Sequence, residues 1–220
     1  MASVEIRKIQ NDTERQEAFK LRYRIYCQKL GWIDPTLHPD QEEWDEYDSS
    51  ATHFVALEDG RTVGTVRLVY PVEKPLPIEA GFPRLTLDDF EAAQDERLSI
   101  AEVSRLIVDF RNGCPRHAIS LGLLQVLIRS SVHGELTHWL QALDKVSFRL
   151  IKWFGFRMKQ FAPSSHFLGS ETIPTVIRID RCFEEFQLRN PPLFEFVSAD
   201  VEPSCVAEHA AVVIEQMRSM

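Results

Sequence analysis

Residues 100–109 read Ile-Ala-Glu-Val-Ser-Arg-Leu-Ile-Val-Asp, and the rest of the chain can be interpreted outward from this stretch. Its β-branched and apolar residues predict a strand. On a regular strand, Glu102 and Ser104 share a face with Leu106, while Arg105 points the other way. A carboxylate on an otherwise apolar face is costly unless it is paired or used. An ordinary strand-end ion pair explains the pattern equally well, and a β-bulge here would re-aim the side chains and leave a backbone N–H free.

Other predicted elements surround this strand. Expected strands cover residues 4–9, 52–57, 62–70, 101–109, 139–143, 156–161 and 175–179. Expected helices cover residues 13–30, 87–93 (a single turn), 119–133, 146–154, 182–188 and 206–217. Asn11-Asp12-Thr13 offers a helix cap, and Gln16 follows Thr13 by three residues as in a capping box. Residues 58–61 predict a hairpin turn, and residues 31–50 predict a long loop. This order predicts an α/β or α+β sandwich around one mixed sheet, with one domain over residues 1–197 and a helical tail over 198–220.

Charge and composition exclude several classes of function. The 220 residues contain 25 Lys and Arg against 33 Asp and Glu, a net charge of −8. This balance disfavours binding to nucleic acid or to an anionic membrane. We find no apolar run near the roughly 20 residues of a membrane span and no signal-peptide pattern, so we expect a cytoplasmic protein. The four cysteines are widely spaced, which favours reduced thiols and predicts no metal site.

A first charged cluster lies in the helix predicted before residue 30. Arg22 and Tyr26 are i,i+4 neighbours on one helix face, and Trp32 follows the helix end at Gly31. A solvated amphipathic helix with a packed Trp accounts for these residues taken alone.

A second cluster is the acidic run Glu-Glu-Trp-Asp-Glu-Tyr-Asp at residues 42–48. A charge run is usually a solvated loop. Its two aromatic residues instead suggest a loop that packs down and presents Asp45 and Asp48 to arginines or to an ammonium group. Arg67, in Gly64-Thr-Val-Arg67, adds a cation inside the predicted sheet, where an ion-paired or snorkelling strand residue is the alternative.

Taken together, these motifs resemble the signature of the autoinducer synthases. The matching elements, in order, are Arg22 with Tyr26 and Trp32, then Asp45-x-x-Asp48, Gly64-x-x-Arg67 and Glu102-x-Ser104-Arg105. They resemble the acyl-homoserine-lactone synthases and equally their relatives, the long-chain N-acyl amino acid synthases and exosortase-associated acyltransferases. The resemblance is close over residues 15–110 and looser over 148–179. It implies a GNAT-like acyltransferase sandwich, with a mixed central sheet flanked by helices.

The resemblance also implies roles for individual residues. Glu102, Ser104 and Arg105 would be catalytic, with Glu102 as the general base and a backbone N–H near Ser104 binding the oxyanion. The acceptor pocket would be formed by Arg22, Tyr26, Trp32, Asp45, Asp48 and Arg67. No metal and no bound cofactor are expected.

The expected donor is an acyl chain carried on the phosphopantetheine of an acyl carrier protein. Residues 111–118 contain one glycine, and Pro115 has no N–H, which makes a poor pyrophosphate cradle for coenzyme A. Acyl carrier protein is acidic, and a basic segment offers a dock for it: Lys145, Arg149, Lys152, Arg157 and Lys159. A merely solvated cationic helix face explains that segment equally well.

Three functions remain open at this point. The preferred one is an N-acyl amino acid synthase, because Asp34-Pro35 and His38-Pro39-Asp40 resemble the N-acyl amino acid and exosortase-associated branch. Tyr26 also stands where the lactone synthases usually have Phe. The alternatives are an acyl-homoserine-lactone synthase that uses S-adenosylmethionine and a non-catalytic acyl-binding protein of the same fold.

Overall fold

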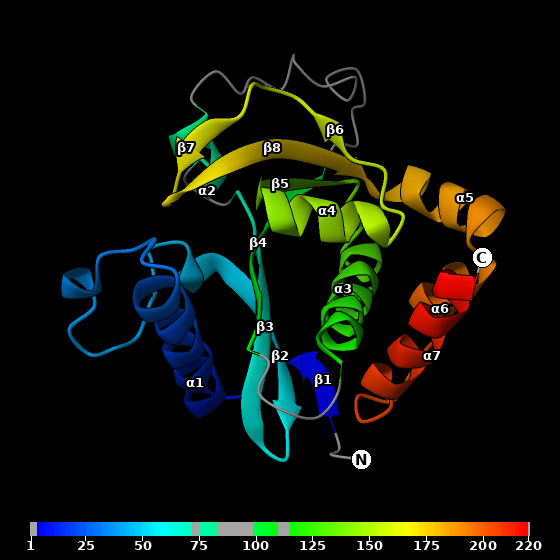
Figure 1. Ribbon diagram of the computed structural model, residues 1–220, viewed down its shortest axis with the longest axis horizontal. Coiled ribbons are helices and arrows are strands. Elements are labelled where there is room, and N and C mark those ends of the chain that lie inside the picture. Colours follow the sequence, from blue (N-terminus) through cyan, green and yellow to red (C-terminus); the bar gives the residue numbers. More distant parts are fainter. Residues whose placement is uncertain (1–3, 72–74, 83–98, 110–114, 220) are drawn as a thin grey trace.

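A mixed β-sheet forms the centre of the computed structural model, which describes residues 4–71, 75–82, 99–109 and 115–219. Eight strands within these residues follow the order β1-β2-β3-β4-β5-β8-β6, and β7 pairs with β8 (Figure 1). Their bounds are β1 Val4–Lys8, β2 Ala51–Glu58, β3 Arg61–Val69, β4 Ile100–Val108, β5 His138–Asp144, β6 Lys159–Gln160, β7 Ser165–Phe167 and β8 Ser170–Arg178. Only the β4–β5 pair is parallel among the described pairs.

Helices cover both faces of the sheet. The α-helices are α1 Asp12–Tyr23, α2 Pro77–Gly81, α3 Arg116–His133, α4 Lys145–Trp153, α5 Ile179–Arg189, α6 Pro191–Ser198 and α7 Val206–Ser219. Helix α1 continues into a π-helical turn at Arg24–Lys29. In Figure 1, α1 lies on one side of β1–β4, and α3 lies on the other side with α7 beyond it. The predicted sandwich with a mixed central sheet is therefore confirmed.

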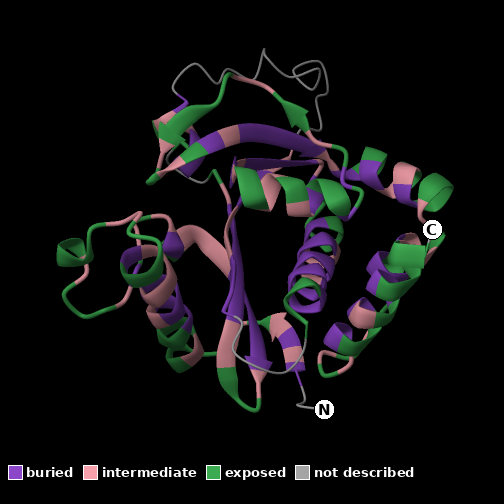
Figure 2. Cartoon of the chain, viewed as in Figure 1, coloured by how far each residue is buried: buried purple, intermediate pink, exposed green. Residues whose placement is uncertain are grey.

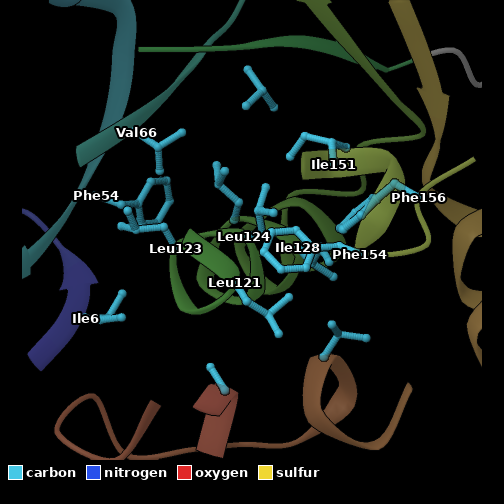
Figure 3. Close-up of a cluster of buried hydrophobic side chains, with 14 of the residues drawn as sticks. Ile6, Phe54, Val66, Leu121, Leu123, Leu124, Ile128, Ile151, Phe154 and Phe156 are labelled. Atoms are coloured by element: carbon cyan, nitrogen blue, oxygen red, sulfur yellow. The ribbon is translucent and has the colours of Figure 1, made fainter. Parts of the chain in front are cut away.

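The main hydrophobic core lies between the sheet and α3. Leu121, Leu123 and Leu124 of α3 are fully buried, and Figure 2 shows that most of this helix is buried. Figure 3 shows α3 side chains packing against Phe54 and Val66 from the sheet. Because nearly all of α3 between Ala118 and Ile128 is buried, the helix needs a cover on the side away from the sheet.

Helix α7 is part of that cover. Its buried residues Val206, Ala207, Ala210, Val213 and Ile214 belong to the main core, and the helix contacts α3 and β1. The segment 198–220 thus contains a helix packed on the body of the protein, and the domain boundary expected at residue 197 stays a prediction. No helix in the described ranges is long and apolar enough to span a bilayer.

The start of α1 differs from the capping box expected at Thr13 and Gln16. Asn11 is the cap, because its side chain accepts a hydrogen bond from the Glu14 N–H at 3.0 Å. Glu14 reaches back to the N–H of Gln10 at 2.9 Å. Two overlapping capping patterns stand in the sequence, and the structure uses the earlier one.

Short elements account for most of the other differences. Helices α2 and α6 and strand β7 were not expected, and the strand expected over residues 156–161 is reduced to Lys159–Gln160. Elements of two to eight residues carry too few periodic positions to be recognised from sequence. The helical turn expected at residues 87–93 lies outside the described residues.

Strands β4 and β5 separate after a short contact. Their described pairing is limited to Ile100–His138, Ala101–Trp139 and Glu102–Leu140, and the remainder of β5 continues to pair with β8. The sheet therefore opens directly after Glu102, in the middle of the strand that carries the proposed catalytic residues.

Candidate active site

A β-bulge in β4 determines how the site residues are oriented. The pairing between β3 and β4 shifts by one residue between Thr65–Ile107 and Arg67–Ser104. Two residues of β4 in this interval therefore face one residue of β3. Arg105 has a positive φ of 58°, in the left-handed region that residues other than glycine rarely occupy. Strained backbone of this kind clusters at functional sites.

The bulge corrects the orientation expected for this strand. Arg105 points to the same side as Ser104, because both contact residues of one polar network. Leu106 packs on the α3 side and does not share a face with Glu102. One extra residue shifts the two-residue alternation of a strand, so every later side chain changes face.

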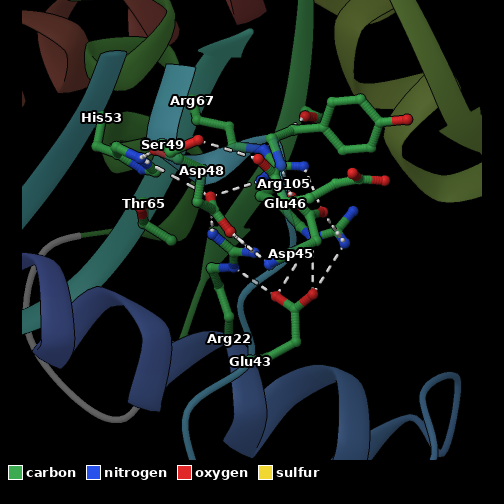
Figure 4. Close-up of polar contacts among 12 residues, drawn as sticks. Arg22, Glu43, Asp45, Glu46, Asp48, Ser49, His53, Thr65, Arg67 and Arg105 are labelled. Atoms are coloured by element: carbon green, nitrogen blue, oxygen red, sulfur yellow. Dashed lines mark hydrogen bonds and ion pairs between the residues drawn. The ribbon is translucent and has the colours of Figure 1, made fainter. Parts of the chain in front are cut away.

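Arg22 anchors the buried polar network on the α1 side of the sheet (Figure 4). Its guanidinium pairs with Asp48 through two bonds of 2.7 and 3.0 Å and donates a third bond to Glu43. All three side chains are almost completely buried. Helix α1 thus binds the acidic loop tightly, in a geometry that uses the planar fork of arginine.

Arg67 and Arg105 complete the network from the sheet. Arg67 holds Asp45 through two bonds of 2.7 Å, also contacts Asp48, and donates to the Ser104 hydroxyl at 3.0 Å. Arg105 bridges Glu43 at 2.8 Å and Asp45 at 3.1 Å. Three arginines and three carboxylates therefore balance each other in a buried cluster.

The arginines keep the buried acids ionised. Burial by itself raises the pKa of Glu43, but Arg105 and Arg22 outweigh it and lower that pKa to about 2. Burial likewise opposes ionisation of Asp48, and Arg22 and Arg67 hold the pKa of Asp48 well below its usual range. These two carboxylates are structural anions and poor proton acceptors near neutral pH.

Sequence reasoning missed Glu43 as a site residue. It lies in the acidic run, beside Glu42 and the exposed Trp44, and nothing in the run distinguishes it from its neighbours. A clue was available in the number of arginines, since three buried guanidinium groups require a third carboxylate besides Asp45 and Asp48. The exposed Trp44 also limits the inference drawn from the two aromatic residues: the loop packs down mainly through its carboxylates.

Glu102 differs from the acids of the network. Its side chain is 2% exposed, and its Oε2 accepts a hydrogen bond from the backbone N–H of Ile78 in α2 at 2.7 Å. Burial raises the pKa of Glu102 to about 7, against the opposing effects of the Ile78 N–H and of Arg67 and Arg105. A carboxyl group that titrates near neutral pH suits general acid–base catalysis.

A cavity of about 340 Å³ occupies the opening between β4 and β5. Glu102, Ser104 and Arg105 line it from β4, and Gln141 and Leu143 line it from β5. Its volume lies in the range of small-ligand sites. The catalytic candidates therefore border a space in which a ligand can lie.

Two stacked aromatic residues form one wall of the cavity. Tyr26 and Trp32 have ring centroids 5.9 Å apart at an interplanar angle of 24°, and both line the cavity. The Arg105 guanidinium lies over the Tyr26 ring at 5.4 Å. The β7–β8 turn packs on this wall, where a Cβ added to Gly169 would lie 2.5 Å from the Trp32 Cα.

The structure thus brings together all nine residues expected at the catalytic and acceptor sites. Six belong to the polar network or contact it, and Tyr26, Trp32 and Glu102 lie beside it on the cavity. Their individual roles stay predictions. Among the described residues, no group of three or more His, Cys, Asp or Glu side chains is placed to hold a metal.

The five cations expected to dock a carrier protein lie on α4 and the segment after it. All five are exposed. Lys145 pairs with Glu171 at 2.5 Å, and Arg157 pairs with Glu185 at 3.0 Å. The positive charge of this surface is therefore partly neutralised by the protein itself, and its docking role stays a prediction.

Comparison with known proteins identifies relatives of this chain. The family model described as "N-acyl amino acid synthase FeeM" matches residues 17–175. The isovaleryl-homoserine lactone synthase of Bradyrhizobium diazoefficiens is 38% identical over 71 residues. That match covers 32% of this chain and 32% of the relative, so it spans about a third of the relative's length.

Solved structures share the fold at low sequence identity. FeeM, an N-acyl amino acid synthase from uncultured soil microbes, aligns with a TM-score of 0.63 and 16% identity, over 84% of this chain and 95% of FeeM. BjaI, a CoA-dependent acyl-homoserine lactone synthase solved with MTA, aligns with a TM-score of 0.67 and 22% identity, over 95% of this chain and 99% of BjaI. The expectation of an acyltransferase is confirmed at the level of the family. Since the family model spans well over half of the sequence, the chain belongs to the N-acyl amino acid synthase FeeM family of acyltransferases.

Proposed function

We propose that this protein is an N-acyl amino acid synthase that moves a fatty acyl group from a thioester to the α-amine of an amino acid. The observation that carries the proposal is Glu102. It is a buried carboxyl group with a pKa of about 7, and it borders the cavity at the point where β4 and β5 separate. Such a group can accept the proton that an attacking amine must lose.

The reaction follows from this placement. Glu102, directly or through one water molecule, removes a proton from the acceptor's ammonium group, and the free amine attacks the thioester carbonyl carbon. The C–N bond forms while the carbonyl becomes an oxyanion, for which the bulged backbone near Ser104 supplies candidate N–H donors. The C–S bond then breaks, the nitrogen loses its second proton to the departing thiolate, and a neutral amide and a free thiol are released while Glu102 holds the first proton.

The polar network supports the acceptor side. The pKa values of Glu43 and Asp48 are lowered, so these two carboxylates stay charged at a pH at which Glu102 exchanges a proton. Arg22 and Arg67 fix the acidic loop against the sheet, and Tyr26 and Trp32 close the cavity with aromatic surface. The network therefore preorganises the pocket, which reduces the entropic cost of positioning the amine.

For the donor, we propose an acyl chain on the phosphopantetheine of an acyl carrier protein, which places the protein in the cytoplasm. The exposed cations Arg149 and Lys152 are the docking residues of first choice, since Lys145 and Arg157 already contact acids. Acidic and basic surfaces that match steer such encounters.

A second candidate is an acyl-homoserine-lactone synthase with S-adenosylmethionine as the acceptor. It is favoured by the 71-residue match to a lactone synthase and by the fold shared with BjaI, which was also solved with SAM and isopentyl-CoA. Glu102 would have the same task in the acylation step of both reactions. The second candidate differs in its acceptor and in a further ring closure, in which the acceptor's carboxylate attacks its γ-carbon and the thioether leaves.

One experiment separates the candidates. The protein is incubated with an acylated carrier protein, or with the matching acyl-CoA, together with either a mixture of amino acids or S-adenosylmethionine, and products are identified by mass spectrometry. An acyl amino acid supports the proposal, and a lactone overturns it in favour of the second candidate. Donor binding without any product from wild-type protein would indicate a non-catalytic acyl-binding protein.

A further inference from the structure

Helix α2 supplies the backbone N–H that reaches Glu102, yet it has only five residues. A helix this short is not stable by itself, so tertiary contacts must hold it in place. The N–H of Ile78 can bind the Glu102 carboxylate only while α2 keeps this position. The groups that hold α2 therefore control a hydrogen bond to the proposed general base.

The half-buried side chain of Phe167 in β7 is one of these groups. Its ring lies on Gly81, the last residue of α2, where an added Cβ would be 2.7 Å from the Cγ and Cε2 atoms of Phe167. The ring also meets Phe82 edge to face, with the two centroids 5.9 Å apart and an interplanar angle of 66°. Any side chain at position 81 would occupy the space of the ring, so the close packing of β7 on α2 requires glycine.

The turn that follows Phe167 contacts the aromatic wall of the cavity. Phe167 and Leu168 line the cavity, and Gly169 packs on Trp32. Leu168 and Gly169 both have a positive φ, 48° and 79°, which is the sign that a type I′ hairpin turn requires at its two central residues. Residues 167–169 therefore contact α2 on one side and the Trp32 wall on the other.

We propose that Phe167 is a positioning residue for the general base: packed on Gly81, it holds α2 where the Ile78 N–H donates a hydrogen bond to Glu102. The inference rests on the proposed function, in which Glu102 accepts the proton of the amine. Phe167 has no polar group in its side chain, so it acts through α2 and exchanges no proton.

The bond from Ile78 favours the ionised form of Glu102, because an N–H donor stabilises a carboxylate. Burial opposes ionisation more strongly, and the balance leaves the pKa of Glu102 at about 7. The charged and titratable groups that face Glu102 from other elements are Arg67 of β3, Arg105 of β4, Asp45 of the acidic loop and, two residues before Leu140 on β5, His138. If α2 moved away, those groups would remain and the pKa of Glu102 would rise above 7.

Two glycines provide a matched pair of variants. Gly81→Ala adds a methyl group against the Phe167 ring, so α2 has to shift. Gly122→Ala adds the same group in α3, where a Cβ would lie 2.5 Å from the Ile6 Cδ1 and 3.0 Å from the Val206 Cγ1. Both variants overpack a glycine in a helix, but only the first does so in the helix that binds Glu102.

The test follows the titration of the Glu102 carboxyl group by NMR, in protein labelled with carbon-13 at the glutamate carboxyl groups. Glu102→Gln identifies the signal. Wild-type protein and Gly122→Ala should titrate with a midpoint of about 7. Gly81→Ala should have a midpoint about one pH unit higher, the effect expected when a hydrogen bond to a charged group is lost.

A double variant tests whether the shift comes from the contact with Phe167. Phe167→Ala makes room for the methyl group, so Gly81→Ala combined with Phe167→Ala should return toward the wild-type midpoint. If Gly81→Ala does not fold, Phe167→Leu tests the same contact. It keeps the position apolar but removes the flat ring that lies on α2, and it should also raise the midpoint.

Three results would overturn the inference: an unchanged midpoint in Gly81→Ala, an equal shift in Gly122→Ala, and a double variant that keeps the full shift. The titration needs no substrate, so it is independent of the proposed function. The pH dependence of kcat/KM, measured on the same variants, should follow the titration. A shifted titration without any amide product, or with a rate that does not follow it, would keep the role of Phe167 and refute Glu102 as the base.

Discussion

Glu102 and Ile78 are joined by a hydrogen bond of 2.7 Å from the backbone N–H of Ile78 to the Glu102 carboxylate. The bond ties the centre of β4 to α2, two elements separated by residues outside the described ranges. It leaves Glu102 buried and fixed at the cavity, with only one described hydrogen-bond donor to its carboxylate. Burial therefore dominates its titration and keeps its pKa near 7.

The first prediction concerns the rate of acyl transfer. Glu102→Gln should lower kcat/KM by about 10²–10⁴-fold, because the amide cannot accept the amine's proton. The wild-type rate should rise with pH through about 7 as Glu102 ionises, and this step should be absent from the residual activity of the variant. Steady-state kinetics between pH 5.5 and 9 measure both effects. A variant with wild-type kcat/KM would remove Glu102 from the mechanism.

The second prediction concerns stability. The pKa of Glu102 is higher in the folded protein than in the unfolded chain, so the folded state holds its proton more tightly. Its contribution to the free energy of unfolding is fully present below about pH 4.5 and is lost as the pH rises through about 7. Glu102→Gln should therefore be more stable than wild type at pH 8, by on the order of 3 kcal/mol, and the difference should shrink toward pH 5. Urea unfolding at several pH values measures the difference, and one that does not vary with pH would contradict the raised pKa.

The third prediction concerns Glu43. Glu43→Gln leaves Arg22 and Arg105 without their shared anion, which should cost about 3–5 kcal/mol at neutral pH. The pKa of Glu43 is lowered to about 2, so its stabilisation is present above about pH 4.5 and is lost as the pH falls toward 2. The variant has no carboxyl group to protonate at position 43, so its free energy of unfolding should fall less than that of wild type as the pH falls toward 2. Glu42→Gln makes the same change one residue away, outside the network, and should have little effect; equal losses in the two variants would contradict the network's role.

The fourth prediction uses a pair of glycines. Gly169 and Gly60 both have positive φ, +79° and +77°, but only Gly169 contacts another segment, at Trp32. Gly60→Ala should cost about 1–2 kcal/mol through backbone strain alone. Gly169→Ala should cost about 1–3 kcal/mol more and also lower kcat/KM, because the turn must move away from the Trp32 wall. Thermal unfolding and kinetics on both variants measure this, and equal effects would show that the contact with Trp32 is unimportant.

The fifth prediction tests the proposed dock. Reversing the charge of Arg149 and Lys152 together should weaken binding of an acyl carrier protein more than reversing Lys145 and Arg157. The latter two are already neutralised by Glu171 and Glu185. The difference should be largest at low salt and fade as ionic strength rises. Binding measured at two salt concentrations checks this, and unchanged affinity in both double variants would move the dock elsewhere.

Much of the fold and of the site follows from the sequence alone. The β2–β3 hairpin, strand β4 and helix α3 were predicted because alternation, turn residues and helical periodicity are local properties. Arg22, Asp45, Asp48 and Arg67 were placed in one site through four short motifs in order, and Glu102 was marked by its charge on an apolar strand.

The tertiary structure decided what those residues can do. Glu43 became a network member because Arg22 and Arg105, which lie 21 and 62 residues away in the chain, both reach it. The Ile78 N–H came from a helix of five residues that sequence periodicity cannot reveal. Gln141 became a cavity residue only because β5 separates from β4 directly beside it.

The bulge at Arg105 shows the physical reason for this division. Sequence reasoning allowed a bulge in β4 but placed Arg105 opposite Glu102, because alternation is the only orientation that a strand pattern specifies. Whether β4 contains an extra residue depends on its pairing with β3 and on the carboxylates that bind the Arg105 guanidinium. Those carboxylates come from a segment distant in the sequence. The sequence by itself thus determined which residues carry the chemistry, and long-range pairing decided the direction in which they point.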